Sequence, residues 1–353
     1  MPDFNSAKEA LDSIIRKSRV HLYKPIQIAE ILYRDRVVND IDLLQLHTYR
    51  TQSKQWRDIV SQELLGTTCT SSSRFQDNLF EENAMPPVLL NELGKKNKET
   101  NGAVEAYIYS QFSNRHSQLS NALDICLNAT HQDFNVKLLI DSFWQEPGLR
   151  RSLDKVYEII VYSLFSVLVE TMQLKVEISV NEDNSELLEE FQDFAQMVMC
   201  LDFSHPTYVQ DAKVYRVGVT NAADRGLDMY SNWGPAIQIK HLSLNTELAE
   251  NIVSSVSSDR IVIVCKDAER DIILSLLTQI GWKARIQSIV TENNLVEWYE
   301  KACKGTYSNI LGEKLLKTLS SEIKKEFPSV SETDFPDILR NRHYETINID
   351  ELL

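Results

Sequence analysis

The C-terminal half of the chain alternates short apolar stretches with longer amphipathic ones, and this alternation constrains the fold more than any other feature. Three stretches predict strands joined by tight turns: 213–219 (KVYRVGV), 226–231 (GLDMYS) and 236–242 (AIQIKHL). Two more strands are predicted at 260–265 and 284–290, with helices at 246–257, 267–280 and 292–304. Such alternation is typical of a sheet with crossover connections. We therefore expect an α/β fold with a mixed sheet flanked by helices.

The rest of the chain is predicted to be mainly helical. A long apolar helix is expected at 152–173, a strand at 175–180, an acidic amphipathic helix at 184–200 and a last helix at 312–326. Within the first 147 residues, Ser53 fits the N-cap of a helix that Gly66 closes. We expect three regions: a mainly helical region at 1–147, a core of sheet and helices at 148–310, and a C-terminal helix with an acidic tail at 311–353.

Charge limits the partners of this chain. It has 37 Lys and Arg residues against 51 Asp and Glu residues, and a formal net charge of −14. A chain this acidic does not attract nucleic acid over its whole surface. Most of the acidic excess lies in residues 151–353, whereas residues 1–150 are nearly neutral. Any DNA-binding surface must therefore be local.

Neither zinc nor a membrane fits the pattern. The five cysteines are far apart, and no C-x-x-C or H-x-x-H pair occurs, so no disulfide framework or zinc site is expected. The longest apolar run, at 159–169, is well short of the ~20 residues that a membrane span needs. The first residues lack the order of charge and apolar character of a signal peptide. We expect a cytoplasmic chain with no membrane partner.

The second and third predicted strands bring three polar side chains together. Successive residues of a strand point to opposite faces of the sheet. Gln238 and Lys240 therefore share one face of their strand, and a reversal at 232–235 (NWGP) can set Asp228 beside them. His241 would point to the other face, where we expect it to be packed.

A carboxylate, an amide oxygen and an ammonium on one face suit the hydrolysis of phosphodiesters. Mg²⁺ prefers hard oxygen ligands and keeps several waters, so Asp228, a neutral oxygen of Gln238 and carbonyl oxygens could hold it with a substrate phosphate. The ion would lower the pKa of a bound water. Lys240 could orient that water and offset the charge that develops on phosphorus. Taken alone, these side chains also fit an ordinary solvated strand face.

The spacing D-x9-Q-x-K resembles the PD-(D/E)xK nuclease motif in the D…QxK form found in Mrr-like nucleases. Leu227 stands where the motif has Pro, and Gln238 stands where it has an acid. The resemblance implies a PD-(D/E)xK-type mixed sheet flanked by helices as the nuclease core. It also implies a metal set of Asp228, Gln238, Ile239 and, from the preceding helix, Glu158. Glu158 fits equally well an ion pair with Lys155 or Arg151.

Longer stretches resemble the HaeII family of type II restriction endonucleases over nearly the whole chain. They are SRVHLYKPIQIAEILY, FQDNLFEENAMPP, LRRSLDKVYEIIVYSLF, YRVGVTNAADRGLDMYSNWGPAIQIKHLSL and DRIVIVCKDAERD. The resemblance implies a Mg²⁺-dependent enzyme that cuts double-stranded DNA within a short palindrome built on GCGC, such as RGCGCY. It also implies a cognate DNA methyltransferase as a functional partner.

Recognition of the DNA bases is expected in the helical N-terminal region. Arg50, Lys54, Gln55 and Arg57 lie at the start of one predicted helix, and their donors suit base edges or phosphates. Arg74 lies in the Ser- and Thr-rich stretch that follows, which is typical of a wing. A winged helix at 24–80 is our hypothesis, and a solvated helix face is its alternative. A palindromic site calls for a homodimer, because each copy would then bind one half-site.

Two other functions stay open from the sequence. A decayed nuclease fold that binds DNA without cutting it would explain the amide at Gln238. An Mrr-like nuclease that cuts methylated DNA would share the D…QxK pattern.

Overall fold

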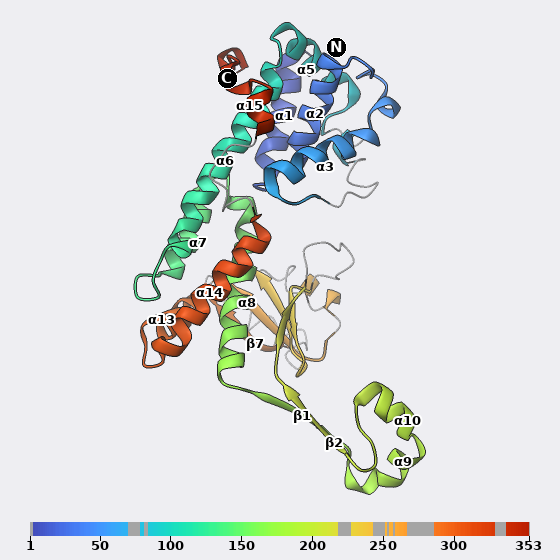
Figure 1. Ribbon diagram of the computed structural model, residues 1–353, viewed down its shortest axis with the longest axis vertical. Helices are drawn as coiled ribbons and strands as arrows, with labels where there is room; N and C mark the ends of the chain where they lie inside the picture. Colours follow the sequence, from blue (N-terminus) through green and yellow to red (C-terminus); the bar gives the residue numbers. More distant parts are fainter. Residues whose placement is uncertain are drawn as a thin grey trace. The chain divides into compact units, whose positions relative to one another are not determined.

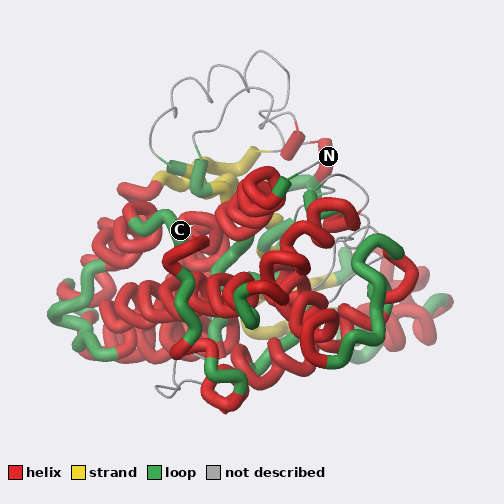
Figure 2. Tube along the Cα trace, turned by 90° about the horizontal axis from the view of Figure 1, so that it is seen from above, coloured by secondary structure: helices red, strands yellow, loops and turns green. Residues whose placement is uncertain are grey.

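The computed structural model describes residues 3–69, 78–80, 84–217, 227–242, 251–252, 254–256, 258–266, 286–328 and 337–352. The chain divides into two compact units. Unit 1 comprises Met1–Ala129, Lys137–Val156 and Ser320–Leu353, and unit 2 comprises Thr130–Val136 and Tyr157–Leu319. The fold is mixed α/β, which confirms the predicted fold class, and helices make up most of the trace in Figure 2. Within the described ranges, no helix has both the length and the apolar character to cross a membrane.

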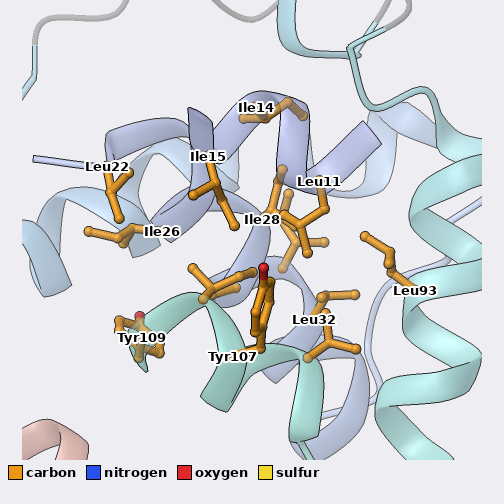
Figure 3. Close-up of a cluster of buried hydrophobic side chains, with 14 of the residues drawn as sticks. Leu11, Ile14, Ile15, Leu22, Ile26, Ile28, Leu32, Leu93, Tyr107 and Tyr109 are labelled. Carbon is orange, nitrogen blue, oxygen red and sulfur yellow. The ribbon is translucent and has the colours of Figure 1, made fainter. Parts of the chain in front are cut away.

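The regular elements among the described residues of unit 1 are helices. Its α-helices are α1 (Phe4–Lys17), α2 (Tyr23–Val37), α3 (Gln52–Leu65), α5 (Pro87–Glu99), α6 (Ala103–Leu127), most of α7 (Val136–Gln145) and α15 (Asp337–Asn341). Short 3-10 turns are η1 (Leu46–Thr48), η2 (Arg150–Ser152), η8 (Tyr344–Thr346) and η9 (Asp350–Leu352). Figure 3 shows side chains of α1, α2, α5 and α6 that meet in one buried cluster, among them Leu11, Ile28, Leu93 and Tyr107.

The first helix illustrates how the sequence specifies this core. The carboxylate of Asp3 caps α1 by accepting a hydrogen bond from the backbone N–H of Ser6 at 2.9 Å, which satisfies one of the free donors at a helix start. Ala7, Leu11 and Ile14 recur at helical spacing and are buried. One face of α1 therefore packs inward while its polar face stays in solvent.

The start of α3 corrects one sequence prediction. Thr51 is the N-cap residue and Ser53 lies inside the helix, where its hydroxyl accepts a hydrogen bond from Nε2 of Gln27 on α2 at 2.9 Å. The hydroxyl that looked like a cap therefore joins two helices instead. The predicted end is confirmed, since Gly66 has φ of 65°, a conformation that glycine adopts without strain.

Unit 2 contains a five-stranded mixed sheet. Its strands are β3 (Val214–Arg216), β4 (Met229–Ser231), β5 (Ala236–Lys240), β6 (Ile261–Cys265) and β7 (Ile286–Thr291), in that spatial order. β3, β4 and β5 are antiparallel neighbours, whereas β5, β6 and β7 are parallel. All five strands were predicted, within a few residues at their ends. The predicted helix at 267–280 lies outside the described residues, as does much of the helix at 246–257.

Unit 2 also contains long helices. They are α8 (Leu153–Thr171), α13 (Glu292–Lys304) and α14 (Ser308–Glu326), of which α8 and α14 each continue into unit 1. The hydroxyl of Tyr299 on α13 donates to the backbone oxygen of Ile160 on α8 at 2.8 Å. The side chain of Thr291 caps α13 directly at the end of β7. These contacts fix α13 against α8 within unit 2.

A second, separate sheet forms an arm. We use this name for residues 175–211, which contain β1 (Lys175–Ser179), the turn η3 (Glu182–Asn184), α9 (Ser185–Glu190), α10 (Gln192–Phe194), the π-helical turn η4 (Ala195–Met199) and β2 (Thr207–Asp211). β1 and β2 pair antiparallel from Lys175 opposite Asp211 to Ser179 opposite Thr207. Figure 1 draws them as one ribbon that leads to α9 and α10. The sequence predicted β1 and the helical stretch but not β2.

Candidate active site

The β4–β5 hairpin builds the predicted polar cluster. Gly234 occupies the turn with φ of 118°, a conformation that favours glycine. Ser231 closes the turn, because its backbone N–H donates to the oxygen of Pro235 at 3.0 Å. Met229 lies opposite Ile237 and Tyr230 opposite Ala236. This register continues to Asp228 opposite Gln238, so the two side chains share one face of the sheet.

Three groups converge on one oxygen of Asp228. Nε2 of Gln238 donates to its Oδ2 at 2.5 Å, and the backbone N–H of Ile239 donates to the same atom at 2.7 Å. Nζ of Lys240 lies 4.0 Å from it. The side chains of Asp228 and Lys240 are 15% and 34% exposed. The structure thus brings together the acid, the amide and the amine, and it leaves the amine partly open to solvent.

The local reason for this convergence lies in the length of β4. β4 begins at Met229, so its backbone does not extend far enough to accept the N–H of Ile239. The carboxylate of Asp228 accepts that hydrogen bond instead. An acid held by a main-chain donor keeps a fixed position, which a binding or catalytic group requires.

Gln238 has an unusual environment for an amide. Its side chain is 2% exposed, and its Oε1 has no hydrogen-bond partner among the described residues. Its neighbour in register on β6 is Ile263, which belongs to an apolar cluster with Ala236 and Cys265. A buried carbonyl oxygen without a partner costs about 1–3 kcal/mol. A cation would satisfy this oxygen, so the donor set fits a metal ion.

The candidate metal site around Asp228 has few charged ligands. Among the described residues, no group of three or more His, Cys, Asp or Glu side chains is placed to hold a metal ion. The sequence predicted the oxygens of the Gln238 amide and of the Ile239 main chain as the other ligands beside Asp228. Mg²⁺ tolerates such a set, because it keeps several waters and needs only one or two carboxylates.

Glu158 is buried on α8, with 7% of its surface exposed. The ring of Tyr157, its neighbour in the chain, meets the ring of His241 edge-on with centroids 4.8 Å apart. His241 directly follows Lys240, so α8 contacts the end of β5. Whether Glu158 acts as a ligand or as an ion-pair partner stays a prediction.

His241 is buried, as predicted, and it has a partner that the sequence did not reveal. Its Nε2 lies 3.0 Å from Oε2 of Glu292, and the two side chains are 2% and 7% exposed. Glu292 opens α13 directly after β7. In the sequence it looked like an ordinary acid in the first turn of a helix, and only the pairing of β5 with β6 and β7 brings it to His241.

One of the predicted DNA-binding residues needs correction. The side chain of Arg57 is fully buried. Its guanidinium donates to Oδ1 of Asp58 and, at 2.9 Å, to the backbone oxygen of Cys69. Arg57 therefore holds α3 to the segment that follows it and is not placed to contact DNA.

The other predicted DNA-binding residues differ in exposure. Arg50 and Lys54 are half-buried and Gln55 is exposed. Arg74 lies outside the described residues, together with the rest of the stretch 70–77. The structure therefore does not describe the predicted wing.

Comparison with known proteins places the chain among restriction endonucleases. It is 54% identical over 344 residues to the type II restriction enzyme HaeII of Haemophilus aegyptius, which covers 98% of each chain. It is 56% identical over 340 residues to the type II restriction enzyme NgoBI of Neisseria gonorrhoeae, which covers 96% of each chain.

A comparison with family models shows which family the chain belongs to. The model of the HaeII restriction endonuclease family matches residues 7–344. The chain therefore belongs to the HaeII restriction endonuclease family, and the resemblance found in the sequence is confirmed, as is the enzyme class. No solved structure matches the chain.

Proposed function

We propose that this chain is a type II restriction endonuclease that uses Mg²⁺ to cut both strands of DNA within a short palindrome built on GCGC, such as RGCGCY. The observation that carries the proposal is the convergence of Gln238, Ile239 and Lys240 on Oδ2 of Asp228. The acid of Asp228, the amide of Gln238 and the amine of Lys240 are side chains suited to hydrolysis of a phosphodiester, and they share one face of a strand pair. Membership of the family supports the choice of DNA as substrate.

We propose that the metal is held by Asp228, by the oxygens of Gln238 and of the Ile239 main chain, and by Glu158. When bound, Mg²⁺ polarises a phosphate and lowers the pKa of a water. The buried Oε1 of Gln238 supports this assignment, because no described residue satisfies it. The N–H of Ile239 fixes the carboxylate of Asp228, so that acid need not reorganise when substrate binds.

Lys240 has a different task. Its ammonium is partly exposed and 4.0 Å from Asp228, close enough to be oriented by the carboxylate while still reaching substrate. The ammonium of Lys240 would hold the attacking water and offset the negative charge that develops on the phosphate. Asp228 would balance the charge of Lys240 in the absence of DNA.

The sheet also supports a PD-(D/E)xK-type core. Three antiparallel strands are followed by two parallel ones, and α8 precedes them in the chain. Leu227 and Gln238 depart from the usual motif. We propose the nuclease core at 148–310 and the C-terminal helix and tail at 311–353.

We propose that the helical region 1–147 recognises the DNA. Arg50, Lys54 and Gln55 on and before α3 are the candidates that the structure leaves available, with Arg74 to be tested beside them. A palindromic site would be bound by a homodimer. The enzyme would act in the cytoplasm beside a DNA methyltransferase that protects host DNA.

Digestion of plasmid DNA tests this function. The purified chain is incubated with unmethylated plasmid, with plasmid methylated at GCGC, and with Mg²⁺ or a chelator. Discrete fragments are expected only from the unmethylated plasmid and only when Mg²⁺ is present. Run-off sequencing of the fragment ends gives the site and the overhang. Cutting of the methylated plasmid but not of the unmethylated one would instead indicate an Mrr-like nuclease. Retention of DNA without cutting would indicate a decayed fold.

A further inference from the structure

The tip of the arm exposes a row of large apolar side chains. Leu187, Phe191, Phe194 and Val198 are 50–65% exposed, and they are spaced four, three and four residues apart. In one unbroken α-helix this spacing would lie along one side, but here the stretch is divided among α9, α10 and the π-helical turn η4, so the four residues share one short exposed segment. Met197, Met199 and Phe203 add to the same stretch, with 43–85% of their surfaces exposed. We call these seven residues the tip patch.

The arm has little core of its own to account for them. Leu188, Ala195 and Leu201 form its buried cluster, with Val180 and Tyr208 packed against it. No residue of β1 or β2 is buried, and half-buried and exposed residues alternate in β2. A two-stranded ribbon with so small a core is marginally stable in water. Covering the tip patch would therefore stabilise the arm.

The charge of the tip excludes DNA as the group that covers it. Residues 180–206 contain seven acidic residues and no Lys or Arg: Glu182, Asp183, Glu186, Glu189, Glu190, Asp193 and Asp202. Such a segment repels a phosphate backbone. The tip patch itself contains none of these acids, so its apolar side chains can pack against a second tip patch.

The size of the tip patch fits one side of a protein interface. Its seven partly exposed side chains amount to on the order of 700 Å² of apolar surface, at ~150–250 Å² for a whole aromatic residue. A standard interface buries ~800 Å² on each partner, and the largest patch on an ordinary monomer is ~300–600 Å².

We propose that the tip patch binds the tip patch of a second copy of this chain, so that the two arms form the dimer contact. A two-fold axis buries the same surface on both copies, so an apolar patch can pack against its own copy. The proposal rests on the proposed function to the extent that a palindromic site calls for two copies. It goes further by assigning the contact to the arm.

Sedimentation of the full-length chain, with a double substitution in the tip patch, tests the proposal. The wild-type chain should sediment at twice its 40.6 kDa at micromolar concentration without DNA. Phe191→Ser with Phe194→Ser should raise the dimer dissociation constant about a hundredfold or more, because four phenyl rings leave the dimer contact. Leu138→Ser, which changes a 57% exposed residue of α7, is the matched control and should leave the dimer intact.

Salt dependence separates this contact from one held by opposite charges. Each tip is acidic, so added salt screens the repulsion between the two arms. The dimer should therefore tighten as salt is raised, whereas binding to DNA or to a basic partner should weaken.

Cross-linking through Cys200 provides a measurement that does not alter the patch. Cys200 is exposed and directly follows η4, whereas Cys126, Cys265 and Cys303 are buried. A short bismaleimide should give a covalent dimer that Cys200→Ser abolishes and Cys69→Ser does not.

The failures of the two proposals are distinguishable. A double variant that stays dimeric, a wild-type monomer, or the lack of a Cys200-dependent cross-link would overturn the arm contact. Loss of DNA retention by the double variant with an unchanged dimer would also overturn it. None of these results bears on whether the plasmid is cut. A dimer that depends on the tip patch but cuts no plasmid would support the arm contact and remove the proposed function.

Discussion

The backbone N–H of Ile239 donates a hydrogen bond to Oδ2 of Asp228 at 2.7 Å, so the main chain of β5 holds the acid of the candidate active site. Gln238 donates to the same oxygen at 2.5 Å from the side chain. Asp228 is therefore positioned by Ile239 through its backbone N–H and by Gln238 through its side-chain amide. Changes at this hairpin should separate the roles of charge, hydrogen bonding and metal binding.

Gln238→Glu should make the folded state depend on metal. The new carboxylate would lie within hydrogen-bond distance of Asp228 in a site that is 2% exposed at this position, and an uncompensated buried charge costs about 3 kcal/mol. Thermal unfolding should show a lower Tm without metal and recovery on adding Mg²⁺, because a ligand that binds the folded state stabilises it.

Gln238→Met is the matched control for this substitution. It keeps the volume and removes the oxygen, so it should show neither the metal-dependent loss of stability nor the recovery. A Gln238→Glu variant whose Tm does not change on adding Mg²⁺ would contradict the assignment of residue 238 as a metal ligand.

The pair of His241 and Glu292 should contribute strongly to the stability of unit 2. Both side chains are nearly buried and their atoms are 3.0 Å apart. Removal of one partner from a buried pair costs about 3–5 kcal/mol, so Glu292→Ala should lower the free energy of unfolding by about 3 kcal/mol. Glu292→Gln keeps an acceptor and should cost about 1 kcal/mol. Urea denaturation measures both.

Glu297→Ala serves as the control on the same helix, because Glu297 is exposed. Its free energy of unfolding should stay within about 0.5 kcal/mol of the wild-type value. Equal effects of Glu292→Ala and Glu297→Ala would show that the buried pair adds no stability.

Stability should fall in mild acid because of His21. Burial lowers the pKa of His21 to about 4, and the cation of Arg19 acts in the same direction. Its ring stacks between Tyr23 and Phe327. In the unfolded chain the pKa is near its ordinary 6.5, so the unfolded state takes up a proton first as pH falls. This group therefore stabilises the fold above about pH 6.5, and that contribution is lost as pH falls towards 4.

His21→Phe should remove this part of the pH dependence and keep the stacking. The difference in unfolding free energy between pH 7 and pH 4 should shrink by about 3 kcal/mol, as measured by urea denaturation at each pH. His47→Gln, at an exposed histidine, should leave the difference unchanged. An unaltered pH dependence in His21→Phe would show that another group is responsible.

The sequence predicted the sheet and the polar cluster because both depend on local periodicity. Ile237 and Ile239 alternate with Gln238 and Lys240, and a period of two determines which side chains share a face. β2 was missed because Thr207–Asp211 is exposed at every second residue and has no buried position. Its apolar residues, Tyr208 and Val209, are adjacent, so its sequence carries no alternating apolar signal.

The errors elsewhere have a common physical origin. Arg57 was expected at the surface because a guanidinium is rarely buried, yet Asp58 and the oxygen of Cys69 satisfy it inside unit 1. Ser53 looked like a helix cap, but Gln27 uses its hydroxyl. The partner of His241 lies 51 residues away. The contacts of Ser53 with Gln27, of His241 with Glu292 and of Arg57 with Cys69 join separate segments of the chain, and no local pattern encodes them.

The most direct test of the account is the cleavage rate of Lys240→Ala on a duplex that contains the recognised site, measured beside binding of the same duplex. The account predicts a loss of cleavage of about a thousandfold with binding and Tm close to the wild-type values. Lys213→Ala, at an exposed lysine just before β3, should cut at the normal rate. Cleavage by Lys240→Ala at the wild-type rate would contradict the assignment of the active site to this hairpin.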